Sequence, residues 1–83
     1  MKAREWINEN ADDTLLMEPE SFDNAIIGLS NDDRVIYSVD KILEILMKDM
    51  SHEEAIEYFE FNIESAYVGD KTPIYCYNLP SGE

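Results

Sequence analysis

The stretch SHEEAIEYFEFNIESAYVG, which runs from Ser51 to Gly69, decides the fold because it predicts one helix with a marked start and a marked end. At the start, the Ser51 hydroxyl can cap the first turn while the Glu54 side chain reaches back to the Ser51 amide. At the end, Gly69 suits the left-handed backbone conformation that closes many helices. We therefore expect a helix from Ser51 to Gly69, with the other elements packed against it.

The apolar residues of this stretch define the face that packs on the core. At about 100° per residue they fill one arc of the helix. We expect Ile56, Phe59 and Ile63, at the centre of the arc, to be core residues. The complete arc consists of Ala55, Ile56, Phe59, Ile63, Ala66 and Tyr67.

A line of carboxylates follows another face of the same helix, and no Lys or Arg lies between residues 51 and 69. The line is ~16 Å long at 1.5 Å rise per residue. Like charges four residues apart cost an isolated helix a few tenths of a kcal/mol. The pattern therefore favours selection for negative potential, although a merely solvated acidic face is the ordinary explanation. The carboxylate line, our predicted partner-binding surface, consists of Glu53, Glu57, Glu60 and Glu64.

Two aromatic residues, Tyr58 and Phe61, project beside the carboxylate line and away from the apolar arc. If the segment around Trp6 packs over them, they are structural. If they are bare, they form an aromatic patch bordered by acids, which is typical of protein-binding surfaces. Asn62 lies at the margin of the arc, where we expect a hydrogen-bonded structural amide, with ligand binding as the alternative.

The rest of the chain supplies the elements around this helix. Two β-rich runs separated by turn formers predict an antiparallel hairpin, and a change to helical spacing with Ser38 as N-cap predicts a second helix. The expected elements are a helix at Ala3–Asn10, strands at Phe22–Leu29 and Arg34–Ser38, a helix at Val39–Met50 and a strand at Thr72–Asn78.

This order, α-β-β-α-α-β, predicts an α+β fold in which helices pack on one face of a three-stranded antiparallel sheet. The sequence does not determine where the third strand lies. Eighty-three residues are enough for one small domain. We expect an N-terminal helix and loop at 1–20, a core at 21–78 and a tail at 79–83.

The net charge of −13, from 19 acidic and 6 basic residues, limits the partners. Direct binding to DNA or RNA and to anionic membranes is disfavoured, because the protein repels polyanions. An acidic surface favours a basic protein partner, a cation, or simply solubility. We expect a basic protein surface as the partner.

Cysteine usage and hydropathy point to the cytoplasm. The lone Cys76 cannot form an internal disulfide, which favours a reducing compartment. The first ten residues, MKAREWINEN, lack the apolar region of a signal peptide, and no segment approaches the ~20 apolar residues of a membrane span. Secretion and membrane insertion are therefore both disfavoured.

The residue types that carry catalysis are sparse, so we do not expect an enzyme. The single histidine, His52, is expected to be exposed in the first turn of its helix, with no nucleophile nearby in the sequence. Cys76, between two tyrosines in a predicted strand, is expected to be a small buried thiol. One Cys and one His exclude zinc sites of the Cys/His type. No metal or cofactor is expected.

Several runs resemble a family of small uncharacterised proteins found largely in bacteriophages and in bacterial genomes with phage-derived genes. The run EYFEFN at 57–62 and the later G-x-x-T-P at 69–73 are its most specific parts, and the resemblance covers roughly Phe22 to Tyr75. It implies a phage or prophage origin. It implies no activity, because none is known for the family, and it does not cover the N-terminus.

These observations lead to three hypotheses. The first is a non-enzymatic interaction module that acts on a basic host protein or defence complex, as an inhibitor or a nucleic-acid mimic. The second is a structural or accessory protein whose helix serves its own homo-oligomer. The third is a ligand-binding or enzymatic domain that uses Asn62, Tyr67 and the strand ends, for which we expect a closed pocket around Asn62.

Overall fold

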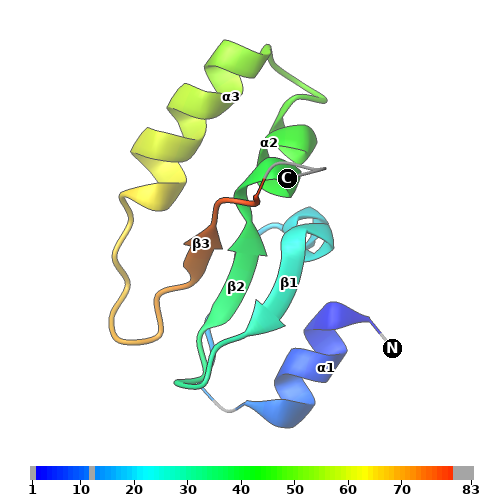
Figure 1. The fold of residues 1–83 in the computed structure, drawn as a ribbon, viewed down its shortest axis with the longest axis vertical. Helices are drawn as coiled ribbons and strands as arrows, with labels where there is room; N and C mark the ends of the chain where they lie inside the picture. The colour runs from blue at the N-terminus through cyan, green and yellow to red at the C-terminus, as the bar shows by residue number, and fades with distance from the viewer. Residues whose placement is uncertain (1, 12, 80–83) are drawn as a thin grey trace.

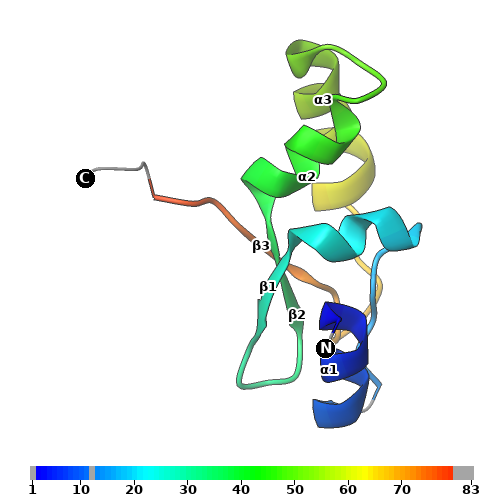
Figure 2. The same ribbon diagram turned by 90° about the vertical axis from the view of Figure 1, so that its right-hand side faces the viewer.

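Helices cover one face of a small sheet in the computed structural model, which describes residues 2–11 and 13–79 (Figure 1, Figure 2). The predicted α+β class and the element order are confirmed, with two additions: a 3₁₀ helix before the first strand and a π-helical extension of the third helix. The elements are α1 (Ala3–Asn10), η1 (Glu20–Ala25), β1 (Ile26–Leu29), β2 (Val35–Ser38), α2 (Val39–Leu46), α3 (His52–Tyr58), η2 (Phe59–Glu64) and β3 (Ile74–Cys76).

The sheet has the order β1-β2-β3 and is mixed. Strands β1 and β2 are antiparallel, as expected for a hairpin, but β3 runs parallel to β2, with Ile36 opposite Ile74 and Ser38 opposite Cys76. The prediction of an antiparallel sheet is therefore wrong for the third strand. A parallel pair needs a crossover of a dozen or more residues. Helices α2 and α3, the extension η2 and the loop that precedes β3 supply this crossover. They return the chain to the end of the sheet at which β2 starts (Figure 1).

The first strand begins later than predicted, because part of the expected strand is the 3₁₀ helix η1. The Phe22 N–H donates to the Pro19 carbonyl at 3.1 Å. In a 3₁₀ helix, residues three apart lie on one side, and Phe22 and Ala25 are accordingly both buried. The register of the β1–β2 pair shifts between Ile26 and Gly28.

Helix α2 starts as predicted and ends early. The Ser38 hydroxyl accepts a hydrogen bond from the Lys41 N–H, which confirms the N-cap. After Leu46 the α-helical pattern gives way to tighter bonds, from the Lys48 N–H to the Ile45 carbonyl and from the Asp49 N–H to the Leu46 carbonyl. The last turn is therefore of the 3₁₀ type, a common helix ending, and the helix does not reach Met50.

The helix expected from Ser51 to Gly69 starts with the predicted capping box between Ser51 and Glu54. It continues as α3 and then, from Phe59, as the π-helical segment η2, which ends at Glu64. Gly69 has the expected positive φ of 109°, but it belongs to a separate turn in which the Thr72 N–H donates to its carbonyl at 3.1 Å. The predicted end at Gly69 is therefore wrong, because the last residues of the stretch form the return loop toward β3.

One core lies between the sheet and the helices. Phe59 and Ile63 are buried as predicted, whereas Ile56 is only partly buried and Ala66 and Tyr67 are exposed. The last two fail the prediction because they follow the helix end. The buried hydrophobic residues are Ile7, Phe22, Ala25, Val35, Tyr37, Val39, Ile42, Leu46, Ala55, Phe59 and Ile63.

The N-terminal helix α1 has its predicted bounds and lies at the end of the molecule opposite α3 (Figure 1, Figure 2). Its Ile7 is buried, and Trp6 is 45% exposed. The Arg4 guanidinium binds both carboxylate oxygens of Asp23 in η1, at 2.8 and 2.9 Å. This bidentate pair fixes α1 to η1, and the pKa of Arg4 is raised by that contact. No helix among the described residues is long and apolar enough to cross a membrane.

Candidate partner-binding helix

The two aromatic residues beside the carboxylate line are exposed. Phe61 is 73% exposed and Tyr58 is 44% exposed. The Trp6 segment does not cover them, since α1 lies at the other end of the molecule (Figure 1). The hypothesis that this segment packs over them is wrong. The four residues of the carboxylate line are also exposed: Glu53, Glu57, Glu60 and Glu64.

The core contact of α3 and η2 divides the remaining surface of the helix into two flanks. Tyr58 and Asn62 line a groove on one side, which we call the groove flank, and Ile56 and Glu60 line a second cavity on the other, which we call the carboxylate flank. Phe61 lines neither and stands between them as the most exposed aromatic side chain of the helix. The two aromatic residues, which we expected to form one patch if they were bare, therefore have different surroundings: Tyr58 lines the groove and Phe61 does not.

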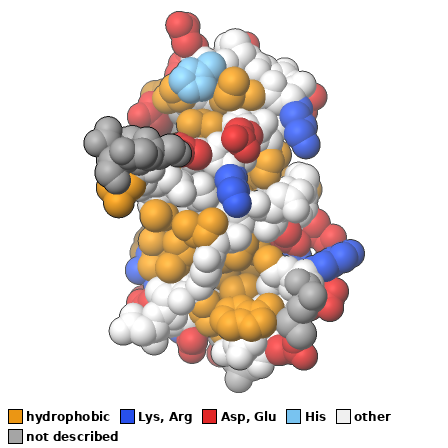
Figure 3. All heavy atoms as spheres, turned by 45° about the vertical axis from the view of Figure 1, so that its right-hand side comes forward, with side chains coloured by type: hydrophobic (Ala, Val, Ile, Leu, Met, Phe, Trp, Pro, Cys, Tyr) orange, Lys and Arg blue, Asp and Glu red, His pale blue; other side chains and the backbone are white. Residues whose placement is uncertain are grey.

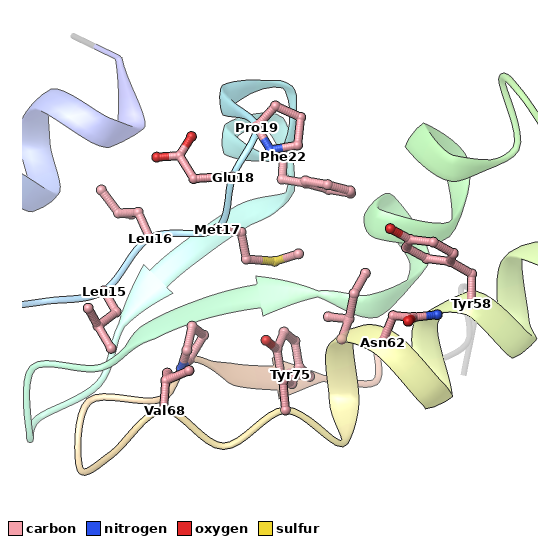
Figure 4. Close-up of a pocket in the computed structure, with 13 residues that line it drawn as sticks. Leu15, Leu16, Met17, Glu18, Pro19, Phe22, Tyr58, Asn62, Val68 and Tyr75 are labelled. Carbon is pink, nitrogen blue, oxygen red and sulfur yellow. The ribbon is translucent and has the colours of Figure 1, made fainter.

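The groove flank holds an open groove with a cavity volume of about 290 Å³. One wall is the helix, the other is the segment between α1 and η1, and the return loop and β3 lie between them (Figure 4). Asn62 is exposed in this wall, so the pocket expected around it by the third hypothesis is present but open rather than closed. The lining residues are Leu15, Leu16, Met17, Glu18, Pro19, Phe22, Tyr58, Asn62, Ile63, Ala66, Val68, Pro73 and Tyr75.

Two hydrogen bonds hold the segment between α1 and η1, which is the far wall of this groove, in place. The Met17 N–H donates to the phenol oxygen of Tyr37 at 2.8 Å, and Arg4 donates to the Met17 carbonyl at 3.3 Å. Tyr37 is fully buried, and burial raises the pKa of its phenol. Tyr75 at the floor packs edge-on against Phe59, with ring centroids 5.5 Å apart. Burial likewise raises the pKa of Tyr75.

The carboxylate flank gathers acids from both helices. Asp40 of α2 and Glu60 of η2 line one cavity of about 190 Å³, together with Tyr77. The Tyr77 hydroxyl donates to a carboxylate oxygen of Glu64 at 2.7 Å. This hydrogen bond raises the pKa of Tyr77 to about 12, because the charged acceptor favours the protonated phenol. Asp40 of α2 thus lies beside Glu60 of the carboxylate line.

Tyr77 is a residue of the carboxylate flank that sequence reasoning missed. A signal was present, because alternation along a strand places Tyr75 and Tyr77 on the same face. Tyr75 contacts Phe59 of the helix, so that face is the one covered by helices. Of the other predicted residues, His52 is exposed, as expected, and Cys76 is only half-buried, so the expectation of a buried thiol is wrong.

Within residues 2–11 and 13–79, no three His, Cys, Asp or Glu side chains gather as a metal site would require. A scan against protein-family models, a search of curated proteins and a search of solved structures find no match to this chain. The resemblance to small phage and prophage proteins therefore stays a prediction.

Proposed function

We propose that this chain is a small acidic protein-interaction module that binds a basic protein surface through α3 and η2. The observation that carries the proposal is the position of Phe61, which is 73% exposed within a helix that has carboxylates and no Lys or Arg. Burying an aromatic ring against a partner removes a large apolar area from water. Surrounding carboxylates would select a partner of positive charge.

The resemblance to phage and prophage proteins supports a role in the host cytoplasm, as an inhibitor of a basic host protein or defence complex. The site favours binding of a protein over direct binding of nucleic acid, because the charge of −13 repels phosphates. Nucleic-acid mimicry is one form such inhibition would take. The carboxylates of one helix, at ~5 Å spacing, are sparser than phosphates at 3.4 Å along a strand. Asp40 beside Glu60 adds charge on the same flank.

The test is charge reversal on the helix with a control of equal charge. The bait proteins are the wild type, a triple Lys variant at Glu57, Glu60 and Glu64, and a triple Lys variant at three exposed acids elsewhere, Glu5, Glu9 and Asp49. Both triple variants raise the net charge equally. Each is used to capture proteins from a host lysate at increasing salt, and the affinity of the recovered protein is then measured with purified components.

We expect the wild type and the control variant to bind one basic protein with an affinity that falls steeply with salt. The helix variant should bind it at least about tenfold more weakly, a change of ~1.4 kcal/mol. Unchanged binding by the helix variant would overturn the proposal. Equal loss in both triple variants would also contradict it, because binding would then depend on net charge rather than on this helix.

A second candidate, the homo-oligomer, is favoured by exposed apolar side chains where α1 meets β1. All helices lie on one side of the sheet (Figure 2), and hydrophobic side chains gather on the surface that Figure 3 shows, including the part near α1. Trp6 and Ile27, each 45% exposed, line a cavity of about 400 Å³ between α1 and β1. Sedimentation of the wild type at low and high salt tests this candidate. A mass above the monomer that does not change with salt would support it, and a monomer at high concentration would exclude it.

A further inference from the structure

We infer that the groove on the groove flank takes one apolar side chain of the basic partner, so that recognition requires a peptide segment carrying an apolar anchor between positive charges. This inference rests on the proposed function, because it names what the same helix binds. It adds a residue requirement for the partner and a second set of contact residues, Tyr58, Asn62 and Val68. None of these belongs to the carboxylate line.

The shape and lining of the groove suit a single large apolar side chain. Its volume of about 290 Å³ is that of a small ligand pocket. Met17 and Phe22 point into it from one wall and Tyr58 from the other, above Tyr75 (Figure 4). Asn62, at the rim, offers an amide donor and an acceptor for the backbone of an incoming segment.

The groove is built before anything binds, because its far wall is tied to the core. The Met17 N–H and carbonyl are both engaged, by Tyr37 and Arg4 respectively. Arg4 is in turn held by Asp23. Because the groove is preformed, binding does not include the free-energy cost of ordering its walls. The groove can therefore contribute to affinity as soon as an anchor enters.

The charge around the groove selects a basic segment. None of the described residues that line the groove is Lys or Arg, and Arg4, which hydrogen-bonds to the far wall, is paired with Asp23. Glu18 lines the groove, and Glu54 lies one helical turn before Tyr58. A second copy of this chain would bring another −13 charges to the contact. A segment with Lys or Arg on both sides of its apolar anchor would complement the negative electrostatic potential of this surface.

A random peptide library selects for the partner's features without assuming its identity. The peptides are about twelve residues long, enough for a helix of ~18 Å, and they are selected on the wild type and on two groove-filled variants. Ala66→Phe fills the groove from the helix end, and Val68→Trp fills it from the return loop. Both residues are exposed, so neither change alters the buried core. Ser65→Phe adds the same ring next to the groove and serves as the control.

We expect peptides enriched on the wild type and on Ser65→Phe to be basic and to share one large apolar position. Replacing that residue by Ala in the best peptide should weaken binding about tenfold to a hundredfold, as expected for burying one apolar side chain. The groove-filled variants should bind the anchored and the Ala peptide equally. Two groove-filled variants protect the test against one that fails to fold, which a thermal melt reveals.

The selection distinguishes a failure of this inference from a failure of the proposed function. Enrichment of basic peptides with no shared apolar position would overturn this inference and leave the proposed function standing. Enrichment that persists unchanged on both folded groove-filled variants would likewise overturn it. If the enriched peptides are not basic at all, the proposed function fails and this inference fails with it.

Discussion

The two flanks of the α3 and η2 helix differ in what supports them. The groove flank faces a wall that is hydrogen-bonded to Tyr37 in the core and to Arg4 of α1, and most of the residues that line the groove are hydrophobic. The carboxylate flank is built at the surface, where Tyr77 and Glu64 share one exposed hydrogen bond. The two flanks therefore contribute differently to binding. Burial of apolar surface in the groove gives affinity, whereas the charge of the carboxylate flank gives partner choice and association rate. A substitution can therefore disturb the contacts that support one flank and leave those of the other flank intact.

The largest expected effect comes from Arg4→Met, which removes the support of the groove flank. It breaks two bonds to the Asp23 carboxylate and one to the Met17 carbonyl. We expect a loss of about 2 kcal/mol in the free energy of unfolding, since hydrogen bonds to charged groups are worth about 1.5–3 kcal/mol. Urea denaturation measures it. In an Asp23→Asn background the same substitution should cost less, and an equal cost would contradict the pairing.

Tyr37→Phe affects the same wall with a smaller change. The Met17 N–H loses its acceptor, and we expect a destabilisation of about 1–2 kcal/mol by urea denaturation. Tyr75→Phe removes a phenol hydroxyl from the floor of the same groove and serves as the control, with a smaller expected loss. If the two variants were equally stable, the Tyr37 hydroxyl would not be holding the wall.

Ser51→Ala should weaken both flanks equally, because it acts on the start of the helix that carries them. The Ser51 hydroxyl accepts the Glu54 N–H at 3.2 Å. Loss of an N-cap costs about 1 kcal/mol, which a thermal or urea melt detects. Ser65→Ala, whose hydroxyl bonds the Phe61 carbonyl at the exposed helix end, should cost less. A cost at Ser65 as large as at Ser51 would show that the cap does not govern the helix.

The smallest effect on stability, and the clearest spectroscopic one, belongs to the carboxylate flank. Glu64→Gln should move the pKa of Tyr77 from about 12 toward its ordinary value, which is about 10 for tyrosine. Carbon NMR of the phenol ring follows this, and Tyr77→Phe assigns the signal. The raised pKa means that the hydrogen bond stabilises the fold fully below pH ~10 and that this contribution is lost as pH rises through about 12. An unshifted signal in Glu64→Gln would contradict the contact.

Local signals predicted the starts of the second and third helices well and their ends poorly. The Ser38 and Ser51 caps are formed as expected, because a cap depends on residues within one turn. The end of the long helix depends on where the chain must go next. Gly69 takes the left-handed conformation expected of it, but in the turn that leads into β3. The parallel direction of β3 is a property of the whole crossover, which no short motif encodes.

The candidate site was predictable only along the helix itself. Periodicity places the carboxylate line and Phe61 without knowledge of other elements, since it depends on the helical repeat alone. The groove is made by segments far apart in sequence, with Met17 and Pro73 among its contributors. Its existence follows from the bonds of Arg4 and Tyr37, which join residues 13 and 20 positions apart. Pairing over such distances is set by packing and leaves no pattern in a single sequence.

Strand β3 lies between the two flanks, because Tyr75 lines the groove and Tyr77, just beyond the strand, reaches Glu64. It has three residues and is held to the sheet by β2 alone. Its local opening is therefore expected to be easy compared with that of the core. A molecule bound on either flank would resist this opening, so slower exchange of the Ile74, Tyr75 and Cys76 amide protons would report that one of the two surfaces is occupied.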